Sequence, residues 1–185
     1  PATGICHYAR TCSAFRTGCR NCVLLPGHGG VNDIAHRVWE RKHKLYNNSN
    51  IHFVTCSRWL EEQARGSALL SGQSVTAIPN AIDMRTFCPS DRAEARQHHH
   101  LPADKRIILF ASQRLTDERK GMPYFVEAVN KLVAANPDMA ANTCVALMGS
   151  HSEEIEQQLA LPVFPLGYLS DERSIAMAYA AADLY

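Results

Sequence analysis

Strand-like and helix-like segments alternate over residues 106–185, and this alternation constrains the fold more than any other feature of the chain. Short apolar runs rich in strand-forming residues are followed by longer stretches in which apolar residues recur at helical spacing. The predicted strands are 106–112, 143–149 and 162–165, and the predicted helices are 121–135, 152–159 and 170–182. Strands connected through helices predict right-handed crossovers and a mostly parallel sheet. Because ligands of such folds bind beyond the carboxyl ends of the strands, those loops are where we look for chemistry.

The first part of the chain shows a similar but weaker alternation. It predicts helices at 31–46 and 57–67 and strands at 51–55 and 74–78, with Asn32 or Asp33 as the cap of the first helix. Residues 79–105 show no period and contain three prolines and a run of three histidines, which is typical of a solvated connection. We therefore expect one domain over 1–78, an interdomain linker over 79–105 and a second domain over 106–185. Residues 183–185 have the pattern of a strand that is just beginning.

Charge and hydropathy narrow the classes of partner. The 185 residues include 19 Lys and Arg against 18 Asp and Glu, so the formal net charge is +1, and we expect no nucleic-acid partner. No apolar run approaches the roughly 18 residues of a membrane span, although contact with a membrane surface stays open. The chain starts at Pro1 with no signal-peptide pattern. We expect a cytoplasmic protein whose sequence is cut at both ends.

Four of the seven cysteines lie in one loop, residues 6–22. They are Cys6, Cys12, Cys19 and Cys22. Four thiolates can bind a structural zinc ion, and the C-x-x-C spacing of the last two lets them reach one metal from a tight turn. Only one pair has that short spacing, so disulfides and free thiols remain alternatives. A redox pair is a weaker interpretation, because Cys19 and Cys22 do not lie between a strand and a helix.

The connection between the strand at 106–112 and the helix at 121–135 contains Arg114 and Lys120, six residues apart. Free N–H groups at a helix start attract anions, and a nearby guanidinium and ammonium add charge and hydrogen-bond donors. This pattern predicts a diphosphate site, whereas the bland alternative is two solvated cations beside Asp117 and Glu118. Neither a Walker motif nor G-x-G-x-x-G is present.

Two further glycine-containing loops follow predicted strands. One contains Gly149 and the other contains Gly167, Tyr168 and Leu169. Glycine after a strand lets a ligand approach the backbone, or it simply makes a turn. Because the strands are expected to be parallel, all three loops should open at the same edge of the sheet.

Taken together, five segments resemble the group 1 glycosyltransferases, also called glycosyltransferase family 4, which are retaining enzymes of the GT-B type. The segments are CHYARTCSAFRTGCRNC, IHFVTCSRWLEEQARGSALL, IPNAIDMRTFCP, ILFASQRLTDERKGMPYFVEAV and PLGYLSDERSIAMAYAAADLY. Their order and spacing cover nearly the whole chain. The resemblance is greatest to bacterial members that build cell-surface polysaccharides such as lipopolysaccharide, in which a cysteine-bearing loop recurs.

The resemblance implies an α/β, GT-B type enzyme with two Rossmann-like domains, both incomplete here. It places a glycan or lipid-linked acceptor on the domain formed by 1–78 and a nucleotide-diphosphate sugar on the domain formed by 106–185. By position, Arg114 and Lys120 resemble the basic pair that holds the donor diphosphate, and catalysis in this family needs no metal cofactor. Gly149 and the loop 167–169 resemble segments near the nucleotide.

The same resemblance places the catalytic residues outside this sequence. A histidine is expected before Pro1, and the acidic residue that contacts the donor sugar is expected after Tyr185, so we assign no catalytic residue here and expect the fragment itself to be inactive. The resemblance is compatible with peripheral association at the inner face of the plasma membrane. Two other interpretations rest on the cysteine loop alone: a non-catalytic, zinc-stabilised interaction module, and a thiol oxidoreductase that uses Cys19 and Cys22.

Overall fold

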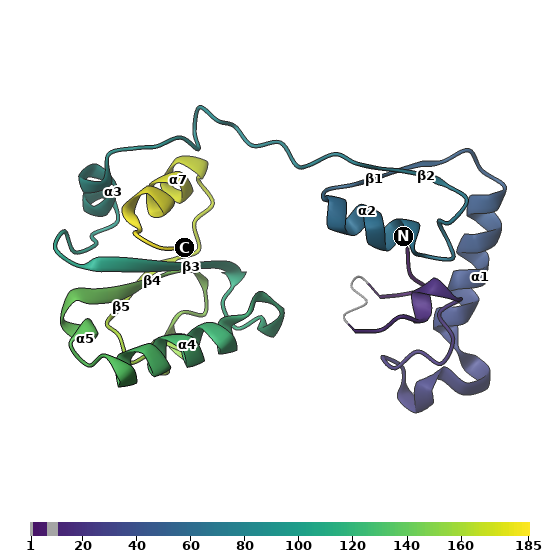
Figure 1. The fold of residues 1–185 in the computed structure, drawn as a ribbon, viewed down its shortest axis with the longest axis horizontal. Coiled ribbons are helices and arrows are strands. Elements are labelled where there is room, and N and C mark those ends of the chain that lie inside the picture. The colour runs from purple at the N-terminus through teal and green to yellow at the C-terminus, as the bar shows by residue number, and fades with distance from the viewer. Residues whose placement is uncertain (1, 7–10) are drawn as a thin grey trace. The chain divides into compact units, whose positions relative to one another are not determined.

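The structure is a computed structural model that describes residues 2–6 and 11–185, and it divides the chain into two compact units. Unit 1 is Pro1–Ala81 and unit 2 is Ile82–Tyr185 (Figure 1). Both units combine helices with parallel strands, so the α/β prediction is confirmed. Within the described residues, no helix is long and apolar enough to cross a membrane.

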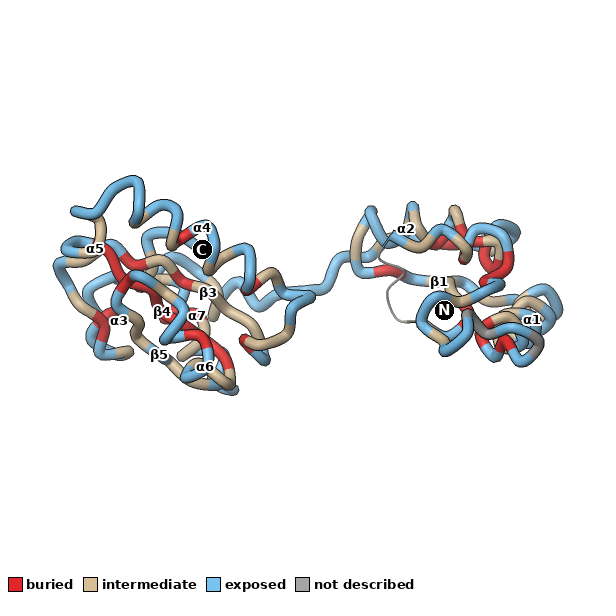
Figure 2. Tube along the Cα trace, turned by 90° about the horizontal axis from the view of Figure 1, so that it is seen from below, coloured by how far each residue is buried: buried red, intermediate tan, exposed pale blue. Residues whose placement is uncertain are grey.

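Unit 2 is built on a three-stranded parallel sheet in the order β3-β4-β5. The strands are β3 (Arg106–Arg114), β4 (Thr143–Ser150) and β5 (Val163–Gly167). The apolar residues of β4 are buried on both faces, as expected for the middle strand of a parallel sheet (Figure 2). On the far side of β3, Leu184 forms a parallel bridge with Ile108, which confirms that the chain enters a strand there.

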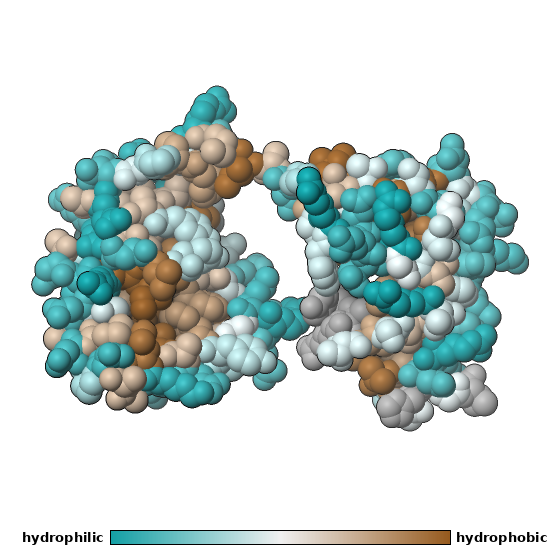
Figure 3. Space-filling model, in the orientation of Figure 1, coloured by the Kyte–Doolittle hydropathy of each residue, from teal (hydrophilic) through white to brown (hydrophobic). Residues whose placement is uncertain are grey.

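Helices cover both faces of this sheet, because successive residues of β4 point to opposite sides. Cys144 and Ala146 pack in one core with α7 (Glu172–Ala181), and Val145 and Leu147 pack in the other with α4 (Met122–Ala135). Two other helices of the unit have four residues each, α5 (Met139–Asn142) and α6 (Glu153–Glu156). The helix predicted over 152–159 is therefore only one turn long. On the face drawn in Figure 3, apolar side chains gather over the sheet between α7 and α4.

The segment 79–105 is not a connection throughout, because it contains a helix that the sequence interpretation missed. This helix is α3 (Arg92–His98), and Asp91 caps it by accepting a hydrogen bond from the Glu94 N–H (2.8 Å). Ala95 of α3 is fully buried in the core that contains α7. Residues from Ile82 onward thus belong to unit 2.

An ion-pair network in which only Arg96 is buried fastens α3 to the end of the chain. Asp183 Oδ2 accepts hydrogen bonds from Arg96 Nη2 (2.8 Å) and from the Ile107 N–H (2.7 Å), while its Oδ1 accepts one from Arg92 Nη1 (2.8 Å). Arg96 also donates to the carbonyl oxygens of Ala181 and Ala103. The Arg96 side chain is 9% exposed, and that of Arg92 is 58% exposed.

Two histidines at the end of α3, His98 and His99, contact α7. The Nε2–H of His99 donates to the Ser174 carbonyl oxygen (2.9 Å), and His98 Nε2 lies 3.3 Å from the Ser174 hydroxyl. Burial lowers the pKa of His99, the Ser174 carbonyl partly opposes this, and the charges of His98 and His100 lower the pKa further.

Unit 1 has a smaller sheet, in which β1 (His52–Thr55) and β2 (Ser74–Ala77) are parallel. Its helices are α1 (Ile34–Asn47) and α2 (Arg58–Arg65), and two 3-10 turns, Ala14–Arg16 and Pro26–Asn32, precede them. Of the two caps proposed for α1, Asp33 is the one observed. Among the residues that the structure describes, its main hydrophobic cluster has four buried members: Ala64, Leu69, Leu70 and Val75.

Replacing Arg96 should destabilise unit 2 far more than replacing Arg92. The change Arg96→Met removes the donor to two carbonyls and one of the two donors to Asp183 Oδ2, so we expect a loss of about 3 kcal/mol. Arg92→Met removes an exposed contact to the same carboxylate and should cost about 0–1 kcal/mol. Hydrogen exchange of the β3 amides measures both; equal losses of protection in the two variants would contradict the network.

Acid should weaken unit 2 through His99. Because the pKa of this histidine is lower in the folded chain than its usual value of about 6.5, the unfolded state binds more protons below that value. The contribution of neutral His99 to the free energy of unfolding is fully present above about pH 6.5. It is lost as the pH falls toward the lowered pKa. Urea unfolding followed by circular dichroism at several pH values should show this slope, and His99→Gln should flatten it; an unchanged slope would rule His99 out.

Candidate functional site

The carboxyl ends of the three strands in unit 2 surround a cavity of about 260 Å³. Its lining residues are Ala111, Ser112, Gln113, Met148, Gly149, Tyr168, Leu169, Ile175 and Tyr179. The structure therefore brings together Gly149 and the Tyr168–Leu169 pair, as the parallel topology predicts. Gly167 pairs with Met148 in the sheet but does not line the cavity.

Gly149 holds the last part of β4 close to β3. Its φ is +148°, and a Cβ atom placed on it would lie 2.0 Å from the Ser112 carbonyl oxygen. Ser150, the next residue, pairs with Arg114 and donates from its hydroxyl to the Gln113 carbonyl (3.0 Å). Glycine is therefore required here for a close approach of two backbones rather than for a turn alone.

The structure corrects the location of the basic pair. Arg114 is the last residue of β3 rather than a loop residue, and Lys120 ends a 3-10 turn, Glu118–Lys120, just before α4. Both side chains are exposed and neither lines the cavity, although Arg114 directly follows its lining residue Gln113. The N-cap of α4 is Gly121, with φ +84° and no side chain over the first N–H groups.

Charges in this connection are unequally neutralised. Asp117 Oδ2 accepts from Arg119 Nη2 (2.6 Å) and its Oδ1 from Arg119 Nε (2.9 Å). These hydrogen bonds lower the pKa of the Asp117 carboxyl to about 2, so the pair stays ionised. Among the described residues, the Arg114 side chain donates only to a neutral partner, Thr116 Oγ1 (2.9 Å), and Lys120 has no ion pair. Two cations therefore remain available to an anion.

The sequence interpretation missed several lining residues of the cavity. Ser112 and Gln113 lie at the carboxyl end of β3, which runs two residues beyond its predicted end. Their place at the end of a parallel strand is the signal that could have identified them. Tyr179 comes from α7, and no sequence motif points to it. The pKa of Tyr179 is raised to about 12, mainly by burial and to a smaller extent by the hydrogen bond to Tyr185.

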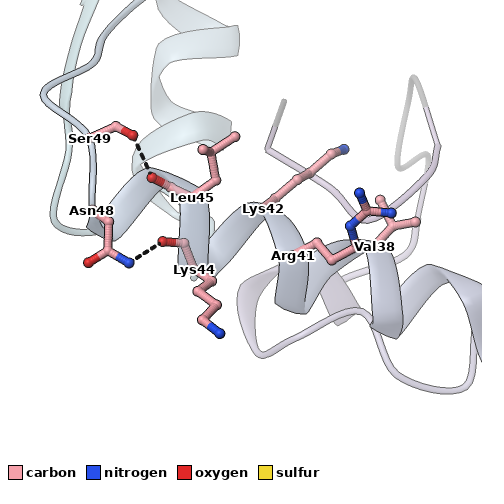
Figure 4. A pocket seen from close by; sticks show the side chains of 7 residues that line it. All are labelled: Val38, Arg41, Lys42, Lys44, Leu45, Asn48 and Ser49. Carbon is pink, nitrogen blue, oxygen red and sulfur yellow. Dashed lines mark hydrogen bonds between the residues drawn. The ribbon is translucent and has the colours of Figure 1, made fainter.

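A second concave surface lies along α1 in unit 1 (Figure 4). It encloses about 670 Å³ and is lined by Val38, Arg41, Lys42, Lys44, Leu45, Asn48 and Ser49. Leu45 is 58% exposed within it. Lys42 is occupied, because its Nζ donates to the carbonyl oxygens of Thr3 (2.9 Å) and Gly4 (2.6 Å). The surface thus combines apolar and basic side chains.

The four loop cysteines have free thiols in the structure. Cys19 is buried and Cys6, Cys12 and Cys22 are partly exposed. Within the described part of the chain, the only group of three or more metal-ligating side chains within 4.8 Å of one another is His151, Glu153 and Glu154. That group is largely exposed, and nothing else in the structure points to a ligand there.

Comparison with proteins of known function finds similarity to glycosyltransferases. D-inositol 3-phosphate glycosyltransferase 1 of Catenulispora acidiphila is 34% identical over 86 residues, which are 45% of this chain and 20% of that protein. Phosphatidyl-myo-inositol mannosyltransferase of Mycolicibacterium smegmatis is 31% identical over 117 residues, which are 62% of this chain and 28% of that protein. The matched segments thus span less than a third of either relative. No family model matches the chain.

A side chain at Gly149 should disrupt the cavity. Gly149→Ala places a methyl group against the Ser112 carbonyl, so we expect a loss of stability above about 2 kcal/mol. Gly167→Ala is the matched control, because its φ is +69° but the space for a Cβ is open; it should cost about 1–2 kcal/mol from backbone strain alone. Thermal unfolding compares the two, and a smaller effect at Gly149 than at Gly167 would contradict the close approach.

Proposed function

We propose that this chain is part of a glycosyltransferase that transfers a sugar from a nucleotide-diphosphate sugar to a glycan or lipid-linked acceptor. The observation that carries the proposal is the β3–α4 connection at the carboxyl edge of a parallel sheet. It presents two cations that have no carboxylate partner in the described part of the chain. The similarity to two glycosyltransferases supports the same class of reaction.

In this proposal, Arg114 and Lys120 bind the donor diphosphate. An anion between them gains a planar guanidinium fork and an ammonium, together with the free N–H groups at the start of α4. Gly149, Gly167, Tyr168 and Leu169 lie near the nucleotide. The cavity supports this arrangement, since it lies at the strand ends, is lined by Gln113 directly before Arg114, and is also lined by Tyr168.

The chemical role of the basic pair follows from where charge develops. When the bond between the sugar and the diphosphate breaks, negative charge grows on the leaving oxygen, and cations already in place stabilise it. We propose retention at the anomeric carbon, a hexosyl donor and membership of the GT-B enzymes of family 4, on the motif series alone. The catalytic residues stay unassigned.

The same proposal places the acceptor on unit 1 and the product in bacterial cell-surface polysaccharide, lipopolysaccharide among them. Peripheral contact with the inner face of the plasma membrane also belongs to it. The apolar and basic residues of the α1 surface, Leu45 with Arg41 and Lys44, have the composition that anionic lipid surfaces attract.

Removing either cation should weaken binding of a nucleoside diphosphate to this chain. For Arg114→Ala and Lys120→Ala we expect Kd for UDP or GDP to rise roughly tenfold each, as for the loss of one charged hydrogen bond. Arg119→Ala is the control from the same turn, because Asp117 already neutralises that guanidinium, and its Kd should stay within about twofold. Isothermal titration calorimetry measures all three.

Transfer by the parent enzyme should follow the same order. Arg114→Ala and Lys120→Ala should lower the rate strongly and Arg119→Ala should not. Unchanged transfer in the first two variants would refute the assignment, as would equal binding of UDP by all three variants of the chain.

A further inference from the structure

Arg114 lies at an irregular point of the sheet in unit 2. Strands β3 and β4 stay in register up to Ala111 and Met148. The next pair is Arg114 with Ser150, so three steps along β3 match two along β4. One extra residue in a strand makes a β-bulge, and bulges redirect the side chains beside them. The bulge therefore affects the direction in which Arg114 leaves the sheet.

Ser150 holds the backbone on both sides of Arg114. Its hydroxyl donates to the Gln113 carbonyl (3.0 Å), and its own carbonyl accepts from the Leu115 N–H (3.1 Å). Leu115 is fully buried in the core that contains α4. Arg114 therefore lies between two backbone groups that a single residue of the neighbouring strand fixes.

The residues on either side of Ser150 have unusual backbone conformations. Gly149 has a φ of +148° at the close approach to β3, and His151 has a φ of 64°, in the left-handed region that few residues other than glycine adopt. Such conformations cost free energy, persist where the surroundings over-determine them, and cluster at functional sites. The strain around Ser150 thus coincides with the contacts that fix Arg114.

Thr116 directs the guanidinium of Arg114. Its Oγ1 accepts a hydrogen bond from Arg114 Nε (2.9 Å). A guanidinium can bind an anion through the edge that contains Nε or through the edge formed by Nη1 and Nη2. Because Thr116 occupies Nε, the edge with the two terminal nitrogens is the one left open within the described part of the chain. Thr116 thus selects a binding edge without neutralising the charge.

We propose that Ser150 and Thr116 are positioning residues that hold Arg114 ready for the donor diphosphate. Ser150 fixes the backbone of Arg114, and Thr116 fixes which edge of its guanidinium faces the anion. Both residues act through Arg114 rather than on the ligand. This inference rests on the proposed function and adds that affinity depends on the preorganisation of Arg114, not on its charge alone.

Preorganisation determines how large the effect should be. An unrestrained arginine loses side-chain freedom when it binds an anion, and this loss weakens binding. The contacts of Ser150 and Thr116 remove part of that freedom before the ligand arrives. Removing either contact should therefore weaken binding several-fold, which is less than the effect of removing the guanidinium itself.

Binding of UDP or GDP to the whole chain, measured by isothermal titration calorimetry, tests the inference. We expect Ser150→Ala and Thr116→Val each to raise Kd about threefold to fivefold. Thr116→Val keeps the shape of the side chain and removes the acceptor, whereas Thr116→Ser keeps the acceptor and should stay within about twofold of the parent. Ser152→Ala is the matched control two residues beyond Ser150, because the Ser152 side chain makes no capping hydrogen bond; it should leave Kd unchanged.

A double-mutant cycle with Arg114→Ala separates positioning from a general loss of structure. Once the guanidinium is absent, Ser150→Ala and Thr116→Val should change Kd by less than about 1.5-fold. A merely structural role would weaken binding by the same factor with and without Arg114, and that result would overturn the inference.

A signal of the ligand-free chain keeps the inference testable if Ser150→Ala does not fold. The Arg114 Nε–H proton, observed by NMR, should exchange with water more slowly in the parent than in Thr116→Val, because Thr116 accepts its hydrogen bond. Equal exchange rates in the two chains would contradict the orientation assigned to the guanidinium.

The diphosphate assignment and the positioning role fail in different ways. If Arg114→Ala leaves Kd unchanged, the diphosphate assignment fails and the positioning role fails with it. If Arg114→Ala weakens binding but Ser150→Ala and Thr116→Val do not, the diphosphate assignment stands and the positioning role alone is overturned.

Discussion

The burial of β4 on both faces is the constraint on which the rest of unit 2 depends. Its residues alternate between two cores, so α7 with α3 must cover one face and α4 with α6 the other. A parallel middle strand also requires that each neighbour be reached by a crossover, which delivers all three carboxyl ends to one edge. The cavity lined by Gly149 and Tyr168 is the product of that arrangement rather than of any single motif.

The anion binding that we propose for this edge depends on charge that is left without a partner among the described residues. In one short connection Arg119 is neutralised by Asp117, whereas Arg114 reaches only a hydroxyl and Lys120 has no ion pair among the described residues. The same sequence of charges could have formed two ion pairs and bound nothing. The bidentate Asp117–Arg119 pair instead shapes the turn and leaves the flanking cations exposed, which is the physical reason for preferring an anion site to a solvated face.

How far the sequence predicts the structure depends on whether a signal is local. Strand and helix periods locate β3, β4, β5, α4 and α7 within a few residues, because apolar periodicity reflects burial directly. Helix α3 was missed because its buried face packs against α7, about eighty residues away in the sequence. The roles of Tyr179 and Asp183 are likewise set by partners that only the folded chain brings together.

The two units are stabilised in different ways. Unit 2 has two apolar cores, and its polar network around Asp183 fastens elements that are already packed. In unit 1 the polar contacts carry more of the organisation. Lys42 and Ser67 donate to the backbone carbonyls of residues 2–4, and the Asp33 carboxylate accepts from the Asn21 N–H while it caps α1. Hydrogen bonds to the backbone therefore take in unit 1 a role that apolar burial takes in unit 2.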